Sequence, residues 1–234
     1  MPRSTIYNRS LIPGPGGPGP RALLDPRGLW ARAAWGLVAL SLLPGDSAAQ
    51  VAPTEIGELA RHPVVSRAFD IIEALEPRTS DDHVTLTEIP APPFMEEERA
   101  QVYMSWLEAA GADSVYIDEE GNVVALRAGR SSGRTVALGG HLDTVFPDGT
   151  DVTVRQRGDT LFAPGIGDDT RGLMVVLTVL RAMEEAAIET EADLRFIGVV
   201  GEEGLGDLRG MKHLFREGAE PIDAWIEVDG GGLG

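Results

Sequence analysis

The sequence contains no cysteine and only one lysine, Lys212, so its other basic residues are arginines. The lack of cysteine excludes disulfides and thiolate zinc sites, and any metal must be held by histidine and carboxylate side chains. No run of about 20 apolar residues occurs, so we expect no stable membrane span.

Basic residues are also few compared with acidic residues. The chain has 20 lysines and arginines against 37 aspartates and glutamates, which gives a net charge of −17. This balance argues against nucleic acid as a partner, because binding to a phosphate backbone requires basic patches. A hydrophobic content of 43% in 234 residues is ordinary for a globular protein, and allows one or two domains with a sizeable core.

The segment 1–49 differs from the rest of the chain. Its first part is rich in arginine, proline and glycine, and an apolar stretch follows at 33–43. The small residues Ser47 and Ala49 suit cleavage by signal peptidase. The pattern predicts a signal peptide and export to the periplasm or the extracellular space. The alternative is an unstructured tail with a short buried helix, in a protein that stays in the cytoplasm.

Turn residues and apolar periodicity divide the segment 50–234 into helices and strands. Pro63 is expected to break the first helix or to start a new one, and the prolines of LTEIPAPPF should keep 86–94 extended. The glutamates at 96–98 are expected to form a solvated first turn. We expect helices at 54–75, 96–112, 170–186 and 207–217, and strands at 113–129 (two, joined by a turn at 120–122), 135–140, 152–163 (a hairpin), 193–200 and 222–228.

Strands and helices alternate from residue 135 onward. This alternation predicts an α/β fold with a mixed, mostly parallel sheet flanked by helices. The chain ends directly after a predicted strand, in GGGLG. We therefore expect residues 50–234 to be the N-terminal part of a catalytic domain, truncated at its C-terminus.

Four acid-bearing stretches stand out, and three of them directly follow predicted strands. The carboxyl ends of parallel strands share one edge of a sheet, where ligands bind in open α/β folds. Acidic side chains gathered there without lysine would repel one another, and a divalent metal would compensate their charge. The stretches are HLDTV (His141, Asp143), GIGDDTRG (Asp168, Asp169), VVGEEG (Glu202, Glu203) and EVDGG (Asp229).

Each stretch has a chemical interpretation and a more ordinary one. His141 can offer an imidazole nitrogen to a metal, although most H-x-D sequences are structural. The carboxylate of Asp168 can bridge two cations, although Asp169 or Thr170 could simply cap the helix that follows. One of Glu202 and Glu203 can bind metal while the other acts as a general base, although paired glutamates after a strand are usually solvated.

The order and spacing of the stretches are more specific than any one of them. Asp168 follows His141 by 27 residues, Glu202 follows Asp168 by 34, and Asp229 follows Glu203 by 26. Each interval is about one strand plus one helix. Asp229 by itself would be an ordinary acid at the end of a strand.

In this order, HLDTVFP, GIGDDTRG, VVGEEGLG and EVDGG resemble the metal-site motifs of the aminoacylase, carboxypeptidase-G and peptidase-T family of co-catalytic zinc hydrolases, in clan MH of the metallopeptidases. The resemblance runs from roughly residue 64 to the end of the sequence. It implies that His141, Asp168 and Asp229 hold one zinc and that Asp168 and Glu203 hold the second. It also implies that Glu202 is the general base, that Asp143 orients His141, and that the Asp168–Asp169 peptide bond is cis.

The resemblance further implies two Zn²⁺ per complete site, with Co²⁺ or Mn²⁺ as substitutes. The implied reaction is hydrolysis of a peptide or N-acyl-amino-acid amide bond, and the implied assembly is a homodimer formed through a lid domain. That lid and a late histidine ligand of the second zinc have no counterpart in the sequence. We therefore expect this chain to hold one zinc well and the second poorly. Thr170 and Arg171 replace a common lysine or glycine of the family.

Three alternatives remain at this point. The chain could belong to a different zinc aminopeptidase family with the same ligand order, although HLDTVFP and LTEIPAPPF argue against it. It could be an inactive fragment that lacks the last zinc ligand. It could also be a nucleotide-binding module that uses GIG or GEEGLG as a phosphate loop, but the acids in those loops would repel phosphate.

Overall fold

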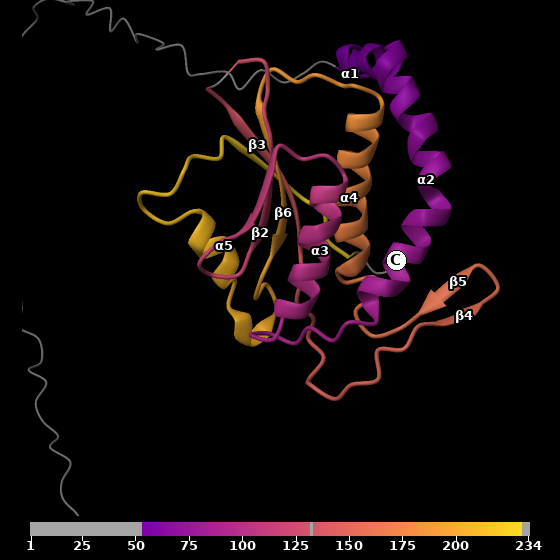
Figure 1. Cartoon of the computed structure of the whole chain (residues 1–234), viewed down its shortest axis with the longest axis vertical. Helices are drawn as coiled ribbons and strands as arrows, with labels where there is room; N and C mark the ends of the chain where they lie inside the picture. The colour runs from indigo at the N-terminus through magenta and orange to yellow at the C-terminus, as the bar shows by residue number, and fades with distance from the viewer. Residues whose placement is uncertain (1–52, 132, 231–234) are drawn as a thin grey trace, which may run out of the picture. The chain divides into compact units, whose positions relative to one another are not determined.

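The computed structural model describes residues 53–131 and 133–230 (Figure 1). The predicted signal peptide at 1–49 lies outside the described residues. The helices are α1 (Pro53–Ala60), α2 (Pro63–Thr87), α3 (Glu97–Ala109), α4 (Thr170–Glu185) and α5 (Arg209–Leu214), with a 3₁₀ turn at Gly204–Gly206. The strands are β1 (Ser114–Ile117), β2 (Val123–Arg127), β3 (Thr135–His141), β4 (Arg155–Arg157), β5 (Thr160–Phe162), β6 (Asp193–Val199) and β7 (Ala224–Glu227).

Five of the strands form one mixed sheet, in the order β1-β2-β6-β3-β7. β3 is parallel to both β6 and β7, whereas β1 and β2 are antiparallel additions at one edge. The carboxyl ends of β3, β6 and β7 therefore meet at one edge, as the sequence predicts. The predicted α/β fold class is confirmed.

The two faces of the sheet have different coverings. Figure 1 shows α3 and α4 on one face and α5 on the other, with α2 packed outside α4. Side chains alternate along β6, so Leu194 and Phe196 enter the core under α3 and α4, while Ile197 and Val199 pack toward α5.

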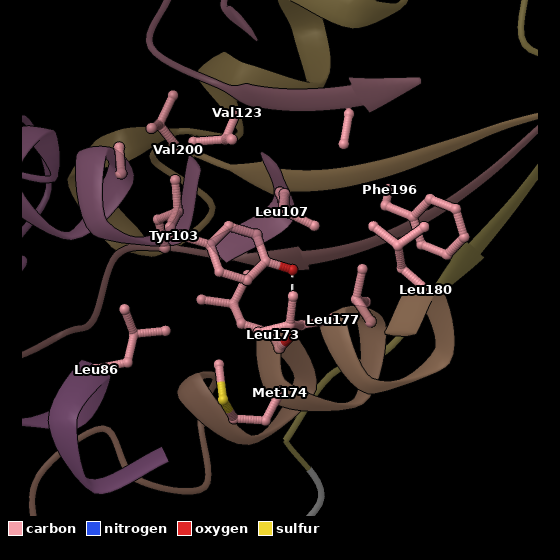
Figure 2. Close-up of a cluster of buried hydrophobic side chains, with 14 of the residues drawn as sticks. Leu86, Tyr103, Leu107, Val123, Leu173, Met174, Leu177, Leu180, Phe196 and Val200 are labelled. Atoms are coloured by element: carbon pink, nitrogen blue, oxygen red, sulfur yellow. Dashed lines mark hydrogen bonds between the residues drawn. The ribbon is translucent and has the colours of Figure 1, made fainter. Parts of the chain in front are cut away.

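The larger core is centred on Tyr103 of α3 (Figure 2). The side chain of Tyr103 is fully buried among the leucines of α4, and its hydroxyl donates a hydrogen bond to the carbonyl of Leu173 at 3.1 Å. This hydrogen bond satisfies the buried hydroxyl and links α3 to the start of α4, which directly follows the GIGDD loop.

The predicted helix at 54–75 was too short at its C-terminal end. Pro63 begins a new helix, as expected, but α2 continues through Pro77 to Thr87. Tertiary contacts with α4 accompany the extra turns: Asp82 binds Arg181 at 2.7 Å, and the hydroxyls of Thr79 and Thr178 lie 3.2 Å apart. Leu86 and Thr87 are consequently helical and buried rather than part of the loop.

The other elements agree with the predictions except at their ends. The hairpin β4–β5 forms, and the turn between β1 and β2 is closed by the Asp118 carboxylate, which accepts three backbone N–H groups. α5 begins later than the predicted 207–217, because Asp207 and Leu208 adopt left-handed backbone angles, and it also ends earlier, at Leu214. Within 53–131 and 133–230, no helix is long and apolar enough to cross a membrane.

Candidate metal centre

His141 is the last residue of β3 and lies at the centre of the acidic cluster. Its side chain is 1% exposed. The Nδ1 atom lies 2.9 Å from the backbone carbonyl oxygen of Asp143, and Nε2 lies 2.9 Å from Oδ1 of Asp168. Because the backbone carbonyl accepts a hydrogen bond from Nδ1–H, Nε2 is the nitrogen that faces the acids and could bind a metal.

Asp168 and Asp229 lie on two different loops that touch each other. Oδ1 of Asp229 is 3.7 Å from Nε2 of His141, and both aspartate side chains are about half exposed. Gly230 passes so close to the other loop that a Cβ there would lie 2.3 Å from the carbonyl oxygen of Gly167. A glycine after Asp229 thus permits the approach of the two loops.

Glu202 and Glu203 complete the cluster from the loop after β6. Among the described residues, two groups have potential ligand atoms within 4.8 Å of one another: His141 with Asp168 and Asp229, and His141 with both glutamates. All five side chains that were predicted from the sequence to bind metal or act as base are therefore brought together, and His141 is common to both groups.

Asp143 differs from its expected position relative to His141. Its carboxylate lies 3.7 Å from Nδ1 of His141, whereas its backbone carbonyl oxygen is nearer. The carboxylate instead accepts the backbone N–H groups of Glu202 and Glu203, each at 2.9 Å. Burial would raise the pKa of Asp143, but its hydrogen bonds outweigh this effect and lower the pKa.

Asp169 is a buried part of the same cluster. Its carboxylate caps α4 by accepting the N–H of Gly172 and also accepts the N–H of His141, both at 2.9 Å. The cap was one interpretation of the sequence, but the bond to the strand residue was not foreseen. The Asp168–Asp169 peptide bond is cis, as the family resemblance implied. Burial raises the pKa of Asp169 to about 7.

The electrostatics of the cluster suit a divalent cation. Burial alone would lower the pKa of His141, but the nearby carboxylates of Asp143, Asp169 and Asp168 raise it to about 10. Burial and the charge of Asp168 likewise raise the pKa of Glu203. These acids thus draw a positive charge to the imidazole, and a metal ion would compensate them more fully. Imidazole nitrogens and carboxylate oxygens are suitable ligands for Zn²⁺, Co²⁺ or Mn²⁺.

Two further polar residues support the cluster and were missed or misjudged from the sequence. Asn122, in the β1–β2 turn, is fully buried; it accepts the N–H of Val200 and donates to the carbonyl of Gly210. Glu96 is 4% exposed and paired with Arg209, so the expectation of a solvated turn was wrong for it. A turn asparagine and a helix-start glutamate are too common in sequences to indicate such roles.

The remaining described histidines stand apart from the cluster. His83 is buried, and its Nε2 lies 2.7 Å from the carbonyl oxygen of Ile166. His213 lies 3.7 Å from the Asp118 carboxylate, and His62 precedes α2. None of the three was expected to match a metal-site motif.

A family of known proteins matches the part of the chain that contains this cluster. Residues 137–233 match the model of peptidase family M20/M25/M40, and this range includes every residue of the cluster. This part of the chain is therefore similar to that family. The resemblance to the zinc-hydrolase family is confirmed by the match.

Curated relatives match a similar part of the chain. A LysW-lysine/LysW-ornithine hydrolase of Pyrococcus abyssi is 35% identical over 138 residues, which cover 59% of this chain and 34% of the relative. A protein of the same name from Thermococcus kodakarensis is 33% identical over 129 residues, which cover 55% and 33%. The match therefore spans about a third of the length of these relatives.

Solved structures support the fold. The aminopeptidase PepT of Bacillus cereus has a TM-score of 0.57 at 24% identity, covering 67% of this chain and 44% of PepT. The dipeptidase Dug1p of Saccharomyces cerevisiae has a TM-score of 0.56 at 18% identity, covering 70% and 40%. Human carnosine dipeptidase 1 has a TM-score of 0.58 at 15% identity, covering 72% and 41%.

Proposed function

We propose that the protein is a metal-dependent hydrolase that cleaves the amide bond of a small peptide or an N-acyl amino acid. The observation that carries the proposal is the position of His141 between two groups of carboxylates. The match of 137–233 to the model of a peptidase family supports the same reaction class.

The proposed roles are those that the family resemblance implies, and the gathering of these side chains around His141 supports them. His141, Asp168 and Asp229 would hold one divalent ion, and Asp168 with Glu203 would hold a second. Asp168 has two carboxylate oxygens and is half exposed, which suits a ligand shared by two ions. Bound divalent ions would lower the pKa of a water molecule and polarise the carbonyl of the scissile amide.

Glu202 is proposed as the proton carrier. It is adjacent to a proposed ligand, Glu203, and lies in the same group as His141. As general base, Glu202 would take a proton from the attacking water while a C–O bond forms at the carbonyl carbon. It would then pass that proton to the nitrogen as the C–N bond breaks, releasing an amine and a carboxylate.

The test is hydrolysis by the purified chain after removal and return of metal. A chelator should abolish cleavage of dipeptides or N-acetyl amino acids, and Zn²⁺, Co²⁺ or Mn²⁺ should restore it. Cleavage of dipeptides would indicate a dipeptidase, and cleavage of N-acetyl amino acids would indicate an amino-acid deacylase. The absence of hydrolysis from the chain with bound metal would favour the inactive-fragment alternative.

We also propose that the protein is exported, on the basis of the leader pattern at 1–49. Expression of the complete sequence with a C-terminal tag, followed by N-terminal sequencing of the secreted protein, tests this proposal. Export predicts a new N-terminus after Ala49. Recovery of only the uncleaved chain in the cytoplasm would contradict it.

A further inference from the structure

The loop that carries Glu202 and Glu203 is closed at its base. Its two ends are joined by hydrogen bonds from the N–H of Arg209 to the carbonyl of Gly201 (3.2 Å) and from the N–H of Gly210 to the carbonyl of Val200 (3.0 Å). The side chain of Asn122 bonds to both ends. The position of the two glutamates therefore depends on what holds the loop 201–208 between these ends.

The side chain of Arg209 packs along one flank of this loop. Gly201 has a φ of +61°, and a Cβ at Gly201 would lie 2.7 Å from Cγ of Arg209. Nη2 of the guanidinium donates to both carboxylate oxygens of Glu96, at 2.9 Å each. Glu96 precedes α3, so the ion pair joins the start of α3 to the start of α5, and Arg209 packs against Gly201, the residue before Glu202.

The guanidinium of Arg209 also contacts the aromatic ring of Phe94 and the carboxylate of Glu120. The guanidinium carbon of Arg209 lies 4.9 Å from the centre of the ring, and Nε lies 3.6 Å from the carboxylate of Glu120. The side chain of Arg209 is 17% exposed and that of Glu96 is 4% exposed. Screening by water is therefore weak. Loss of Arg209 leaves the charge of Glu96 buried and unpaired, and loss of Glu96 leaves Arg209 with only the longer contact to Glu120.

α5 cannot hold Arg209 in place by itself. The helix has six residues, and the two residues before it, Asp207 and Leu208, have φ values of +53° and +56°. Isolated helices of this length are unstable, and left-handed backbone angles are unfavourable outside glycine. Contacts outside the helix must therefore maintain this conformation, and the pair with Glu96 is one of them.

We propose that Arg209 and Glu96 are positioning residues that hold the Glu202–Glu203 loop at the metal centre. The inference rests on the proposed function for the roles of these two glutamates. Arginine is required rather than lysine, because a planar guanidinium can donate to Glu96 and stack on Phe94 at the same time.

The test compares Arg209→Met, Arg209→Lys and Glu96→Gln in the full chain. Lys212→Met is the matched control, because it removes an exposed ion pair to Asp207, in the same segment. Hydrogen–deuterium exchange of the peptide containing 201–208 reports on the loop directly, since the N–H groups of Glu202 and Glu203 are bonded to Asp143.

We expect exchange of this peptide to be at least ~10-fold faster in Arg209→Met and Glu96→Gln, because local opening of the loop becomes easier. Arg209→Lys should fall between Arg209→Met and wild type, and Lys212→Met should match wild type. In the loaded enzyme, kcat should fall by roughly 10–100-fold with little change in KM, as for other residues that orient metal ligands.

Unchanged exchange in Arg209→Met and Glu96→Gln would overturn the proposal, even if activity fell. If Arg209→Met does not fold, exchange in Glu96→Gln still tests the proposal, because glutamine has the same size as glutamate and removes only the charge. Faster exchange in a protein whose wild type hydrolyses no amide would refute the proposed function and leave the positioning role supported.

Discussion

The carboxylate of Asp143 accepts the backbone N–H of Glu202 at 2.9 Å. The backbone carbonyl of Asp143 contacts the ring of His141, also at 2.9 Å. Asp143, in the loop after β3, therefore contacts the central histidine with its main chain and holds the glutamate loop after β6 with its side chain. This relationship makes Asp143 a link between the proposed metal ligand and the proposed base.

Replacement of Asp143 by asparagine should disturb the glutamate loop more than the histidine. Asparagine keeps the backbone carbonyl but presents an NH₂ group toward one of the two N–H donors, which leaves that donor unsatisfied. We expect kcat/KM to fall by about 10–100-fold, in the range for residues that support metal ligands. Asp148→Asn, in the exposed part of the following loop, is the control and should retain activity.

Glu202→Gln should separate catalysis from metal binding. The variant should bind as much metal as wild type, while kcat falls by about 10²–10⁴-fold, because glutamine cannot accept the proton from water. Steady-state kinetics and elemental analysis of the same sample measure the two effects. Retention of normal turnover would remove Glu202 from the role of base.

His141→Ala should reduce the metal content, because His141 belongs to both groups of potential ligands. Elemental analysis after dialysis against Zn²⁺ measures the loss. His62→Ala changes an exposed histidine outside the cluster and should bind metal like wild type. Equal metal in the His141 variant and the control would contradict the ligand assignment.

His83 should make the free energy of unfolding depend on pH. Burial lowers the pKa of His83 from its usual 6.5, so the unfolded chain binds a proton more readily than the folded protein. Its contribution to stability is therefore complete above pH 6.5 and decreases as the pH falls toward the lower pKa of the folded state. As the pH falls from 7.5 to 5, the free energy of unfolding should therefore decrease less, or increase more, in His83→Gln than in wild type, since the glutamine amide can still donate to Ile166. Urea unfolding measures this difference, and an identical pH dependence in both proteins would refute the role of His83.

Tyr103→Phe should destabilise the core without changing its shape. The variant loses the buried hydrogen bond to the Leu173 carbonyl, and we expect the free energy of unfolding to fall by about 1 kcal/mol. Tyr116→Phe is the control, since Tyr116 is 41% exposed and its loss should have little effect. Chemical denaturation of both variants tests the difference; equal stabilities would show that the Tyr103 hydroxyl contributes nothing.

Local patterns were sufficient to predict most of the elements and the members of the cluster. Pro63 marks the start of α2 because its ring suits the first turn of a helix, and the apolar runs before His141, Glu202 and Asp229 are parallel strands. The end of α2 could not be predicted in this way. Its last turns are accompanied by contacts with Thr178 and Arg181, which lie about a hundred positions later in the sequence.

The sequence by itself determined which side chains meet at the carboxyl edge of the sheet, because short apolar runs indicate the parallel strands and the motifs after them carry the residue types that bind metal. Only the tertiary structure decided how those side chains are held. Asp143 binds the backbone of Glu202 and Glu203, Asn122 joins the ends of their loop, and Arg209 pairs with a buried Glu96. These bonds connect residues 59 to 113 positions apart, and such distant pairings depend on packing rather than on any local pattern.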